Sequence, residues 1–405
     1  MKLIEGGVCA AKGFKASGLH VGVKTRNKDK KDLALIVSDD ECTAAAVYTK
    51  NIVKAAPLGV TKEHLKDGKA RAVLANSGNA NACAPLGEEN ARRMCSAIAA
   101  ELRLNETDVI VASTGVIGQT LPVEVIEGGV SELVSKLSYD GSKDAALAIM
   151  TTDLEMKEIA VEFTVGGKLA RIGGIAKGSG MIHPNMGTML AFLTSDCAIS
   201  AEMIQKALID ATNISFNRVS VDGDTSTNDM LTLMANGAAG NAEINASGAD
   251  FDAFTDALNA VCIGLAKMIA ADGEGATHLI TCHVMGAQNE ADAEKLAMSV
   301  ISSTLTKAAI FGADANWGRI LCAMGYSGVG FNPGSVSVAF KSNAGEITVC
   351  SAGSGVDFDE AAAKKILTEH EITIEVDIGA GNAECTCWGC DITYDYIKIN
   401  GDYRT

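Results

Sequence analysis

An alternating apolar pattern near the middle of the chain most constrains how it can fold. Apolar side chains occupy every second position from 159 to 165, and Gly166-Gly167 follows them directly. Alternation with a period of two indicates a strand with one buried face, and a Gly-Gly pair suits the tight turn of a hairpin. The pattern therefore predicts an antiparallel hairpin, whose second strand passes residues 169 and 172 and ends at Lys177.

Helices and further strands are expected on both sides of this hairpin. No linker, low-complexity tract or short-period repeat divides the chain. Ser142 is expected to cap a helix that carries Ala146, Ile149 and Met150. Apolar residues with a helical period predict further helices, and short apolar runs predict strands; the helices lie at 94–102, 254–269 and 293–301, and the strands at 33–37, 72–75, 109–111, 189–193 and 277–284. This mixture predicts α/β layers with largely antiparallel hairpins.

Composition narrows the function classes. The 405 residues carry a formal net charge of −16, which argues against nucleic acid or an anionic membrane as the main partner, since both need basic patches. No signal-peptide pattern follows Met1, and no stretch is expected to have the length needed to span a bilayer. These features predict a cytoplasmic protein.

The twelve cysteines are expected to be reduced core residues, because disulfides are rare in a cytosolic protein. Cys385, Cys387 and Cys390 form the one cluster. The cluster has the ligand types for half of a zinc site, but no second Cys/His pair of matching spacing accompanies it. A buried strand is therefore the favoured interpretation, and no metal site is predicted.

Two other polar features have more than one interpretation. The acidic residues Asp222, Asp224 and Asp229 have the ligand type for Ca²⁺ or Mg²⁺, but they lack the order of an EF-hand loop, and a hydrogen-bonded turn is favoured. His183 has no Asp/Ser partner pattern, so it is interpreted as structural or substrate-adjacent rather than catalytic.

The segment 176–190 carries the most specific pattern in the chain. It reads Ala-Lys-Gly-Ser-Gly-Met-Ile-His-Pro-Asn-Met-Gly-Thr-Met-Leu, which indicates an irregular loop between two strands. The loop is rich in glycine, as phosphate-binding loops are. A P-loop, however, needs Gly-Lys-Ser/Thr in order at a helix start, and GxGxxG needs a third glycine that is missing after Gly178 and Gly180.

This segment resembles the cleavage and nucleophile segment of the ornithine acetyltransferases (glutamate N-acetyltransferases) of arginine biosynthesis, which usually reads Lys-Gly-x-Gly-Met-x-x-Pro-Asn-Met-Ala-Thr-Met-Leu. The sequence departs from that pattern at Gly187, where the family usually has Ala. The resemblance extends over nearly the whole chain, through the segments 6–7, 12–15, 76–81, 113–118, 220–229, 272–277, 314–319, 388–391 and 398–405.

The resemblance implies that the chain cuts itself between Gly187 and Thr188 and that Thr188 is then the nucleophile. A threonine hydroxyl needs an adjacent base, and the new α-amine of Thr188, with an ordinary pKa of ~7.7–8.0, suits that role. The small Gly187 suits a scissile peptide that must tolerate strain. The two products of this cleavage would be an α chain of residues 1–187 and a β chain of residues 188–405.

The resemblance also assigns the remaining site residues. It implies that Thr114 and Gly115 form the oxyanion hole, because a turn at a strand end can aim a hydroxyl and a backbone N–H at one point. It implies a substrate pocket in which Lys177 meets a carboxylate and Glu274 meets the ammonium of ornithine. The other residues of the pocket would be Thr151, Thr188, Asn400 and Thr405.

The implied fold is α+β, a layered α/β/β/α sandwich of the ornithine acetyltransferase type, similar to N-terminal-nucleophile enzymes. The implied reaction is a ping-pong transfer of acetyl from N²-acetyl-L-ornithine to L-glutamate through acetyl-Thr188. The implied assembly is a heterotetramer of two α and two β chains that needs no metal or other cofactor. Whether acetyl-CoA is also a donor stays open.

Two rival classes also stay open at this stage. A related N-terminal-nucleophile aminopeptidase would share the self-cleavage but hydrolyse its acyl-enzyme. The match of residues 398–405 argues against it. A binding protein that keeps the fold without catalysis is the second rival, and a denaturing gel that shows one uncut chain would favour it.

Overall fold

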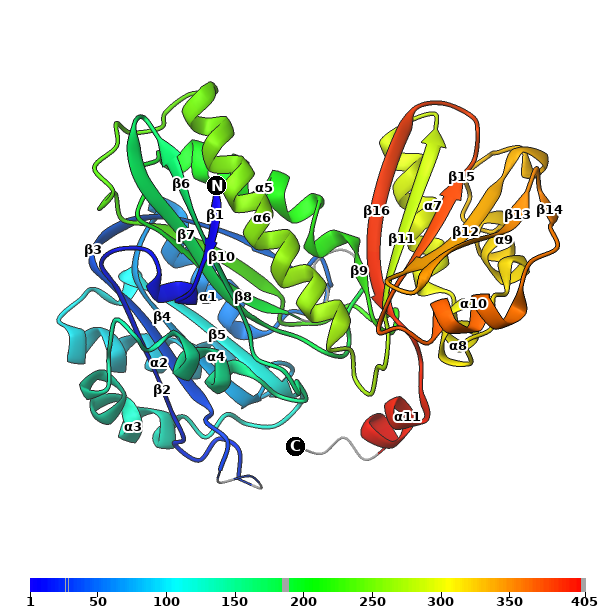
Figure 1. Cartoon of the computed structure of the whole chain (residues 1–405). Helices are drawn as coiled ribbons and strands as arrows, with labels where there is room; N and C mark the ends of the chain where they lie inside the picture. The colour runs from blue at the N-terminus through cyan, green and yellow to red at the C-terminus, as the bar shows by residue number, and fades with distance from the viewer. Residues whose placement is uncertain (26, 28, 184–188, 402–405) are drawn as a thin grey trace.

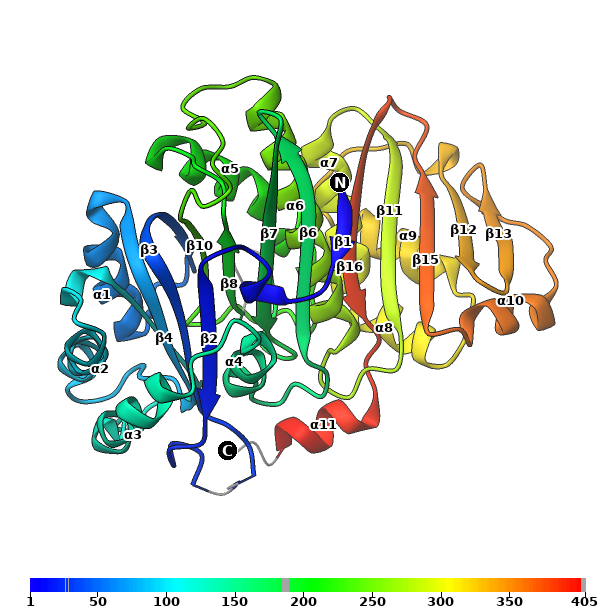
Figure 2. The ribbon, with the colours of Figure 1, turned by 60° about the vertical axis from the view of Figure 1, so that its left-hand side comes forward.

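A computed structural model describes residues 1–25, 27, 29–183 and 189–401. Two β-sheets lie side by side, as both views show (Figures 1 and 2), with helices packed against each. The mixed α+β class that the sequence predicts is thus confirmed. Most strand pairs are antiparallel, as expected, while β4–β5, β8–β10, β11–β15 and β9–β16 are parallel.

The first sheet has nine strands in the order β1-β6-β7-β8-β10-β3-β4-β5, and β2 also pairs with β3. The predicted hairpin is confirmed, with Val165 opposite Lys168 across the glycine turn. The strands are β1 (Lys2–Ile4), β2 (Phe14–Leu19), β3 (Leu33–Tyr48), β4 (Lys69–Asn79), β5 (Val109–Val116), β6 (Lys157–Val165), β7 (Lys168–Lys177), β8 (Leu190–Ser195) and β10 (Met230–Ala235).

The second sheet has the order β14-β13-β12-β15-β11-β16-β9. The strand β16 carries Cys385, Cys387 and Cys390, all buried, which confirms the strand interpretation of that cluster. The strands are β9 (Val219–Ser220), β11 (Leu279–Ala287), β12 (Ser337–Ser342), β13 (Gly345–Ser351), β14 (Ser354–Gly355), β15 (Glu371–Asp377) and β16 (Ala383–Cys390).

Helices cover the sheets. The long α6 packs on β6 and β7 of the first sheet and also contacts β16 of the second, while α7 packs on β11 and β16. The helices are α1 (Ala56–His64), α2 (Gly87–Leu102), α3 (Val123–Ser135), α4 (Ser142–Ile149), α5 (Ala201–Asn213), α6 (Ala249–Ala271), α7 (Glu290–Ser302), α8 (Thr304–Phe311), α9 (Trp317–Gly325), α10 (Glu360–Leu367) and α11 (Tyr394–Gly401).

The helix α6 corrects one expectation. Its 23 residues are by length and composition sufficient to cross a membrane, so the expectation that no stretch has that length is wrong. Half of its most apolar window is buried within the protein, and Phe254, Leu258 and Val261 are fully buried in the core. The core helix of a globular protein passes the same length test, so one such helix is weak evidence for a membrane span.

Ser142 does not cap α4, which corrects a second expectation. The helix begins at Ser142 itself, and the N-cap residue is Gly141, without a side-chain cap. A Cβ atom at Gly141 would lie 1.8 Å from the carbonyl oxygen of Ala16, so only glycine fits there. The Ser142 hydroxyl instead accepts the N–H of Val8 (3.1 Å) and donates to Glu158 (2.9 Å), because partners distant in the sequence occupy it.

Candidate active site

A cavity of about 240 Å³ lies where the ends of β5 and β7 meet the segments around Thr151, Asn228 and Glu274, and α11. Its size suits a small molecule rather than a polymer. The residues that line it are Thr114, Gly115, Val116, Ile117, Thr151, Thr152, Lys177, Gly180, Met181, Ser226, Thr227, Asn228, Glu274 and Asn400. Six residues that the resemblance assigns to the site are therefore together: Thr114, Gly115, Thr151, Lys177, Glu274 and Asn400.

Gly187, Thr188 and Thr405 lie outside the described residues. The chain on either side of 184–188 is described, and two carboxylates accept hydrogen bonds from its backbone. Asp222 accepts the N–H groups of Met181 (2.6 Å) and Ile182 (2.9 Å). This is the hydrogen-bonded role expected of the acidic run.

The residue that follows Thr188 is held by a second carboxylate. Asp229 accepts the N–H of Met189 at 2.9 Å. The Asp229 side chain is fully buried, and its second oxygen has no partner among the described residues. Burial raises the pKa of this carboxyl well above its ordinary value. Met189 is thus bound by the residue that follows Asn228, which lines the cavity.

The residues predicted to form the oxyanion hole, Thr114 and Gly115, occupy the end of β5, the edge strand beside β4. Gly115 has φ +135°, and a Cβ atom there would lie 2.3 Å from the carbonyl carbon of Gly78, so both backbone angle and space require glycine. Thr114 is 3% exposed, and its hydroxyl accepts a hydrogen bond of 3.4 Å from the ammonium of Lys177. A hydroxyl that accepts from a cation becomes a better donor, which suits stabilisation of an oxyanion.

Lys177 is the last residue of β7 and pairs with Leu190 of β8. Its side chain is 3% exposed, and burial lowers the pKa of its ammonium. The nearby carboxylates of Asp153, Glu274 and Asp229 act in the opposite direction. A cation with little water around it and counter-charges behind it is well suited to bind a substrate carboxylate.

Glu274 follows the end of α6 and is 8% exposed. Its backbone N–H donates to the carbonyl of Ser179 (2.8 Å), and its carboxylate accepts from the amide of Asn400 (2.6 Å). A Cβ atom at Gly180 would lie 2.4 Å from the Glu274 carboxyl carbon, so glycine permits this close approach. The contact with Asn400 brings α11 to the cavity.

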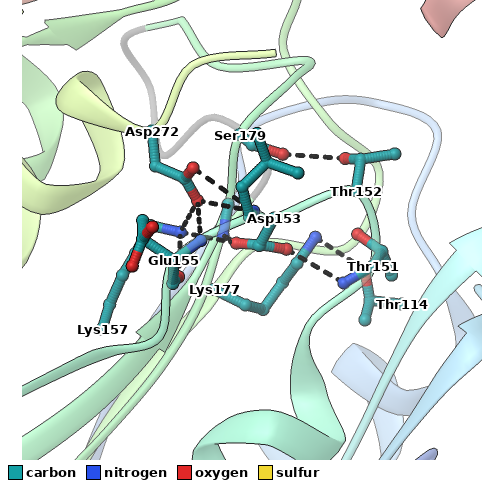
Figure 3. Close-up of polar contacts among 11 residues, drawn as sticks. Thr114, Thr151, Thr152, Asp153, Glu155, Lys157, Lys177, Ser179 and Asp272 are labelled. Atoms are coloured by element: carbon teal, nitrogen blue, oxygen red, sulfur yellow. Dashed lines mark hydrogen bonds and ion pairs between the residues drawn. The ribbon is translucent and has the colours of Figure 1, made fainter. Parts of the chain in front are cut away.

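The sequence interpretation missed Asp153 as a site residue. Its carboxylate accepts the N–H groups of Thr151 (2.9 Å) and Gly178 (2.6 Å) and the ammonium of Lys157 (2.8 Å). Figure 3 shows it between Lys157 and Thr151. In the sequence, the one feature that could have pointed to Asp153 is its position two residues after Thr151. Asn228 was missed as well; its amide donates to the carbonyls of Ala80 and Ser113, both at 2.7 Å, and joins its segment to β5.

His183 and the cysteines lie outside the cavity lining. The His183 ring is 3.0 Å from the Ser220 hydroxyl, and burial lowers the pKa of its imidazole. Among the described residues, no group of three or more His, Cys, Asp or Glu side chains has the arrangement of a metal site.

Comparison with known proteins gives a consistent result. A model of the ArgJ family matches residues 15–405. The arginine biosynthesis bifunctional proteins ArgJ of Symbiobacterium thermophilum and Caldanaerobacter subterraneus are 50% and 49% identical to this chain, and each match covers 100% of both proteins. The crystal structure of the arginine biosynthesis bifunctional protein ArgJ from Bacillus halodurans matches with 45% identity and a TM-score of 0.51, covering 53% of this chain and 100% of that chain.

Proposed function

The chain belongs to the ArgJ family and is an acyltransferase of arginine biosynthesis, and we propose from this membership that it moves acetyl from N²-acetyl-L-ornithine to L-glutamate through an acetyl-Thr188 intermediate. The observation that carries the proposal is the convergence of Thr114, Gly115, Lys177 and Glu274 on one small cavity. These groups supply an oxyanion hole, a cation for a carboxylate and an anion for an ammonium.

The proposed enzyme first cuts its own chain. The Thr188 hydroxyl attacks the Gly187 carbonyl carbon, and the peptide C–N bond breaks. The Thr188 nitrogen takes up the proton that the hydroxyl loses, so the products are an ester and an amine. Water then hydrolyses the ester, which leaves a carboxylate on Gly187 and a free amine on Thr188. The Bacillus halodurans chain supports this step, because it matches over its whole length yet covers only 53% of this chain. The proposed fragment 188–405 is likewise slightly more than half of the chain.

In the transfer reaction the Thr188 amine is proposed to take the hydroxyl proton while the oxygen attacks the acetyl carbon of acetylornithine. The negative oxygen of the tetrahedral intermediate receives hydrogen bonds from the Thr114 hydroxyl and the Gly115 N–H. The amide bond then breaks, and ornithine leaves with the proton. The amine of glutamate attacks the acetyl-Thr188 ester by the reverse route, which regenerates the hydroxyl.

Charge pairing is proposed to select the substrates. Lys177 binds the α-carboxylate that acetylornithine and glutamate share, and Glu274 binds the distal ammonium of ornithine. Thr151, Asn400 and Thr405 are proposed to complete the set of substrate-binding residues. Because one amide is exchanged for another, we propose that no metal or organic cofactor takes part; acetyl-CoA is proposed as a second donor, in keeping with the bifunctional name of the relatives.

The proposed mature protein is a heterotetramer of two 1–187 and two 188–405 chains that acts in the cytoplasm. Intact mass spectrometry of the purified protein, followed by acetyl-transfer assays with acetylornithine and with acetyl-CoA, tests the proposal. Two fragments that begin at Met1 and Thr188 are expected, together with glutamate-dependent formation of acetylglutamate. Thr188→Ala should give one uncut chain without activity. An Ala variant that is still cut at the same bond, or a product that is acetate instead of acetylglutamate, would refute the proposal.

A further inference from the structure

A buried network of charges lies behind the cavity and has no part in the steps above. Asp153 and Lys157 are each 1% exposed, and Asp272 is 9% exposed. The ammonium of Lys157 donates to Asp153 (2.8 Å) and to Asp272 (2.5 Å), as Figure 3 shows. Burying an ion pair is costly and is often no more stabilising than apolar packing. Stability alone therefore does not account for this network.

Asp153 bonds Thr151, which lines the cavity, and Gly178, which follows the lining residue Lys177. One oxygen accepts the N–H of Gly178, at the start of the segment that leads to Thr188, and the other accepts the N–H of Thr151. Burial alone would raise the pKa of Asp153, but the charges of Lys177 and Lys157 and the hydrogen bonds that it accepts hold the pKa below its usual range. Asp153 is thus a buried anion in contact with a residue that lines the cavity.

The charged groups that face Lys177 come from several elements. Asp153, Glu274 and Asp229 raise the pKa of its ammonium, whereas burial, as the largest influence, and the charge of Lys157 lower it. Lys24 also faces it: its ammonium donates to the carbonyl of Met150 (2.7 Å), and burial lowers its own pKa to about 8. Asp153, whose oxygen accepts the N–H of the next residue, Gly178, is thus a counter-charge close to Lys177.

We propose that Asp153 is a positioning residue of the acyl-transfer site, which supplies the counter-charge of Lys177 and holds Thr151 and Gly178 against the cavity, while Lys157 and Asp272 fix its own place. The proposal rests on the proposed function, in which Lys177 binds the substrate carboxylate. Asp272 belongs to the same network because it also accepts the N–H groups of Leu154 and Glu155. These hydrogen bonds hold the residues that follow Asp153.

Asp153 and Lys157 have opposite effects on the pKa of Lys177: Asp153 raises it and Lys157 lowers it. Carboxylate binding requires a protonated Lys177, so KM for acetylornithine rises as pH increases through the pKa of Lys177. Asp153→Asn removes an attraction and should move this rise to lower pH, by about one unit or more. Lys157→Met removes a repulsion and should move the rise to higher pH. General damage to the fold cannot produce shifts of opposite sign.

The experiment measures kcat and KM for acetylornithine between pH 6 and pH 10.5 with cleaved parent protein and the two variants. Ionisation of the substrates is common to all samples, so differences report on the protein. Asp196→Asn is the matched control: Asp196 is also fully buried and accepts two backbone N–H groups, those of Lys12 (3.2 Å) and Arg171 (2.7 Å), but at the opposite end of β8. Its pH profile should coincide with that of the parent.

Opposite shifts for Asp153→Asn and Lys157→Met support the proposal, and KM at low pH should return toward the parental value in Asp153→Asn. Unshifted profiles, or shifts in the same direction, overturn it. If Asp153→Asn does not fold, the Lys157→Met profile decides alone. In that variant KM must begin to rise at a higher pH than in the parent, and a rise at the same or a lower pH overturns the proposal. A parent protein that transfers no acetyl at any pH would overturn the proposed function itself, which separates the two failures.

Discussion

Thr114→Ala is the sharpest test of how the cavity stabilises charge. The Thr114 hydroxyl is buried at the end of β5 and, among the described residues, accepts a long hydrogen bond, of 3.4 Å, from Lys177. Its own proton can therefore be donated to the oxygen of a tetrahedral intermediate. Removing one oxyanion donor typically costs 10²–10³ in kcat, about 2.7–4 kcal/mol. We expect a loss of that order, and not more, because the N–H of Gly115 remains.

The kinetic signature distinguishes this role from substrate binding. The hydrogen bond exists mainly in the transition state, so kcat should fall with a much smaller change in KM. Thr114→Ser keeps the hydroxyl and should stay within a few-fold of the parent, which controls for loss of the methyl group. Acetylglutamate formation is measured at saturating substrates and divided by the fraction of cleaved chain from intact mass spectrometry. A kcat for Thr114→Ala within a few-fold of the parent would refute the assignment and place the donors elsewhere.

Three further predictions test other parts of the site. Glu274→Gln should raise KM for acetylornithine by about tenfold or more, the usual cost of losing a charged hydrogen bond, while chain cleavage continues; equal kinetics of the two proteins would remove Glu274 from the pocket. Gly180→Ala should also raise that KM, because its Cβ atom would push against the Glu274 carboxyl group, whereas Gly59→Ala, with nothing within 4 Å, should have no such effect; steady-state assays of both variants check this. Treatment with a chelator should leave activity unchanged, and stoichiometric zinc found by elemental analysis, with activity lost on its removal, would contradict the structural role of Cys385, Cys387 and Cys390.

Local patterns in the sequence predicted those parts of the fold that local physics decides. The hairpin around Gly166-Gly167 was predictable because alternation and turn chemistry agree within twenty residues. The cap at Ser142 was not, because the hydroxyl is taken by Val8 and Glu158 through contacts that only the folded sheet creates. No helix was expected at residues 394–401, yet they form α11, which has no buried residue of its own and reaches the site through Asn400.

The candidate site, like the fold, depends on contacts between residues that are distant in the sequence. Thr114, Lys177 and Glu274 have no spacing in the sequence that would bring them together; their roles came from a family resemblance, and their meeting depends on sheet register, such as Lys177 opposite Leu190. Asp153 was missed because an aspartate two residues after a threonine usually only closes a turn. Its second role appears once β7 places Gly178 and Lys177 beside it. A buried anion that serves several backbone donors and a neighbouring cation has no local signature. The residues that set the electrostatics of such a site are consequently found in the structure, even where those that react are recognisable in the sequence.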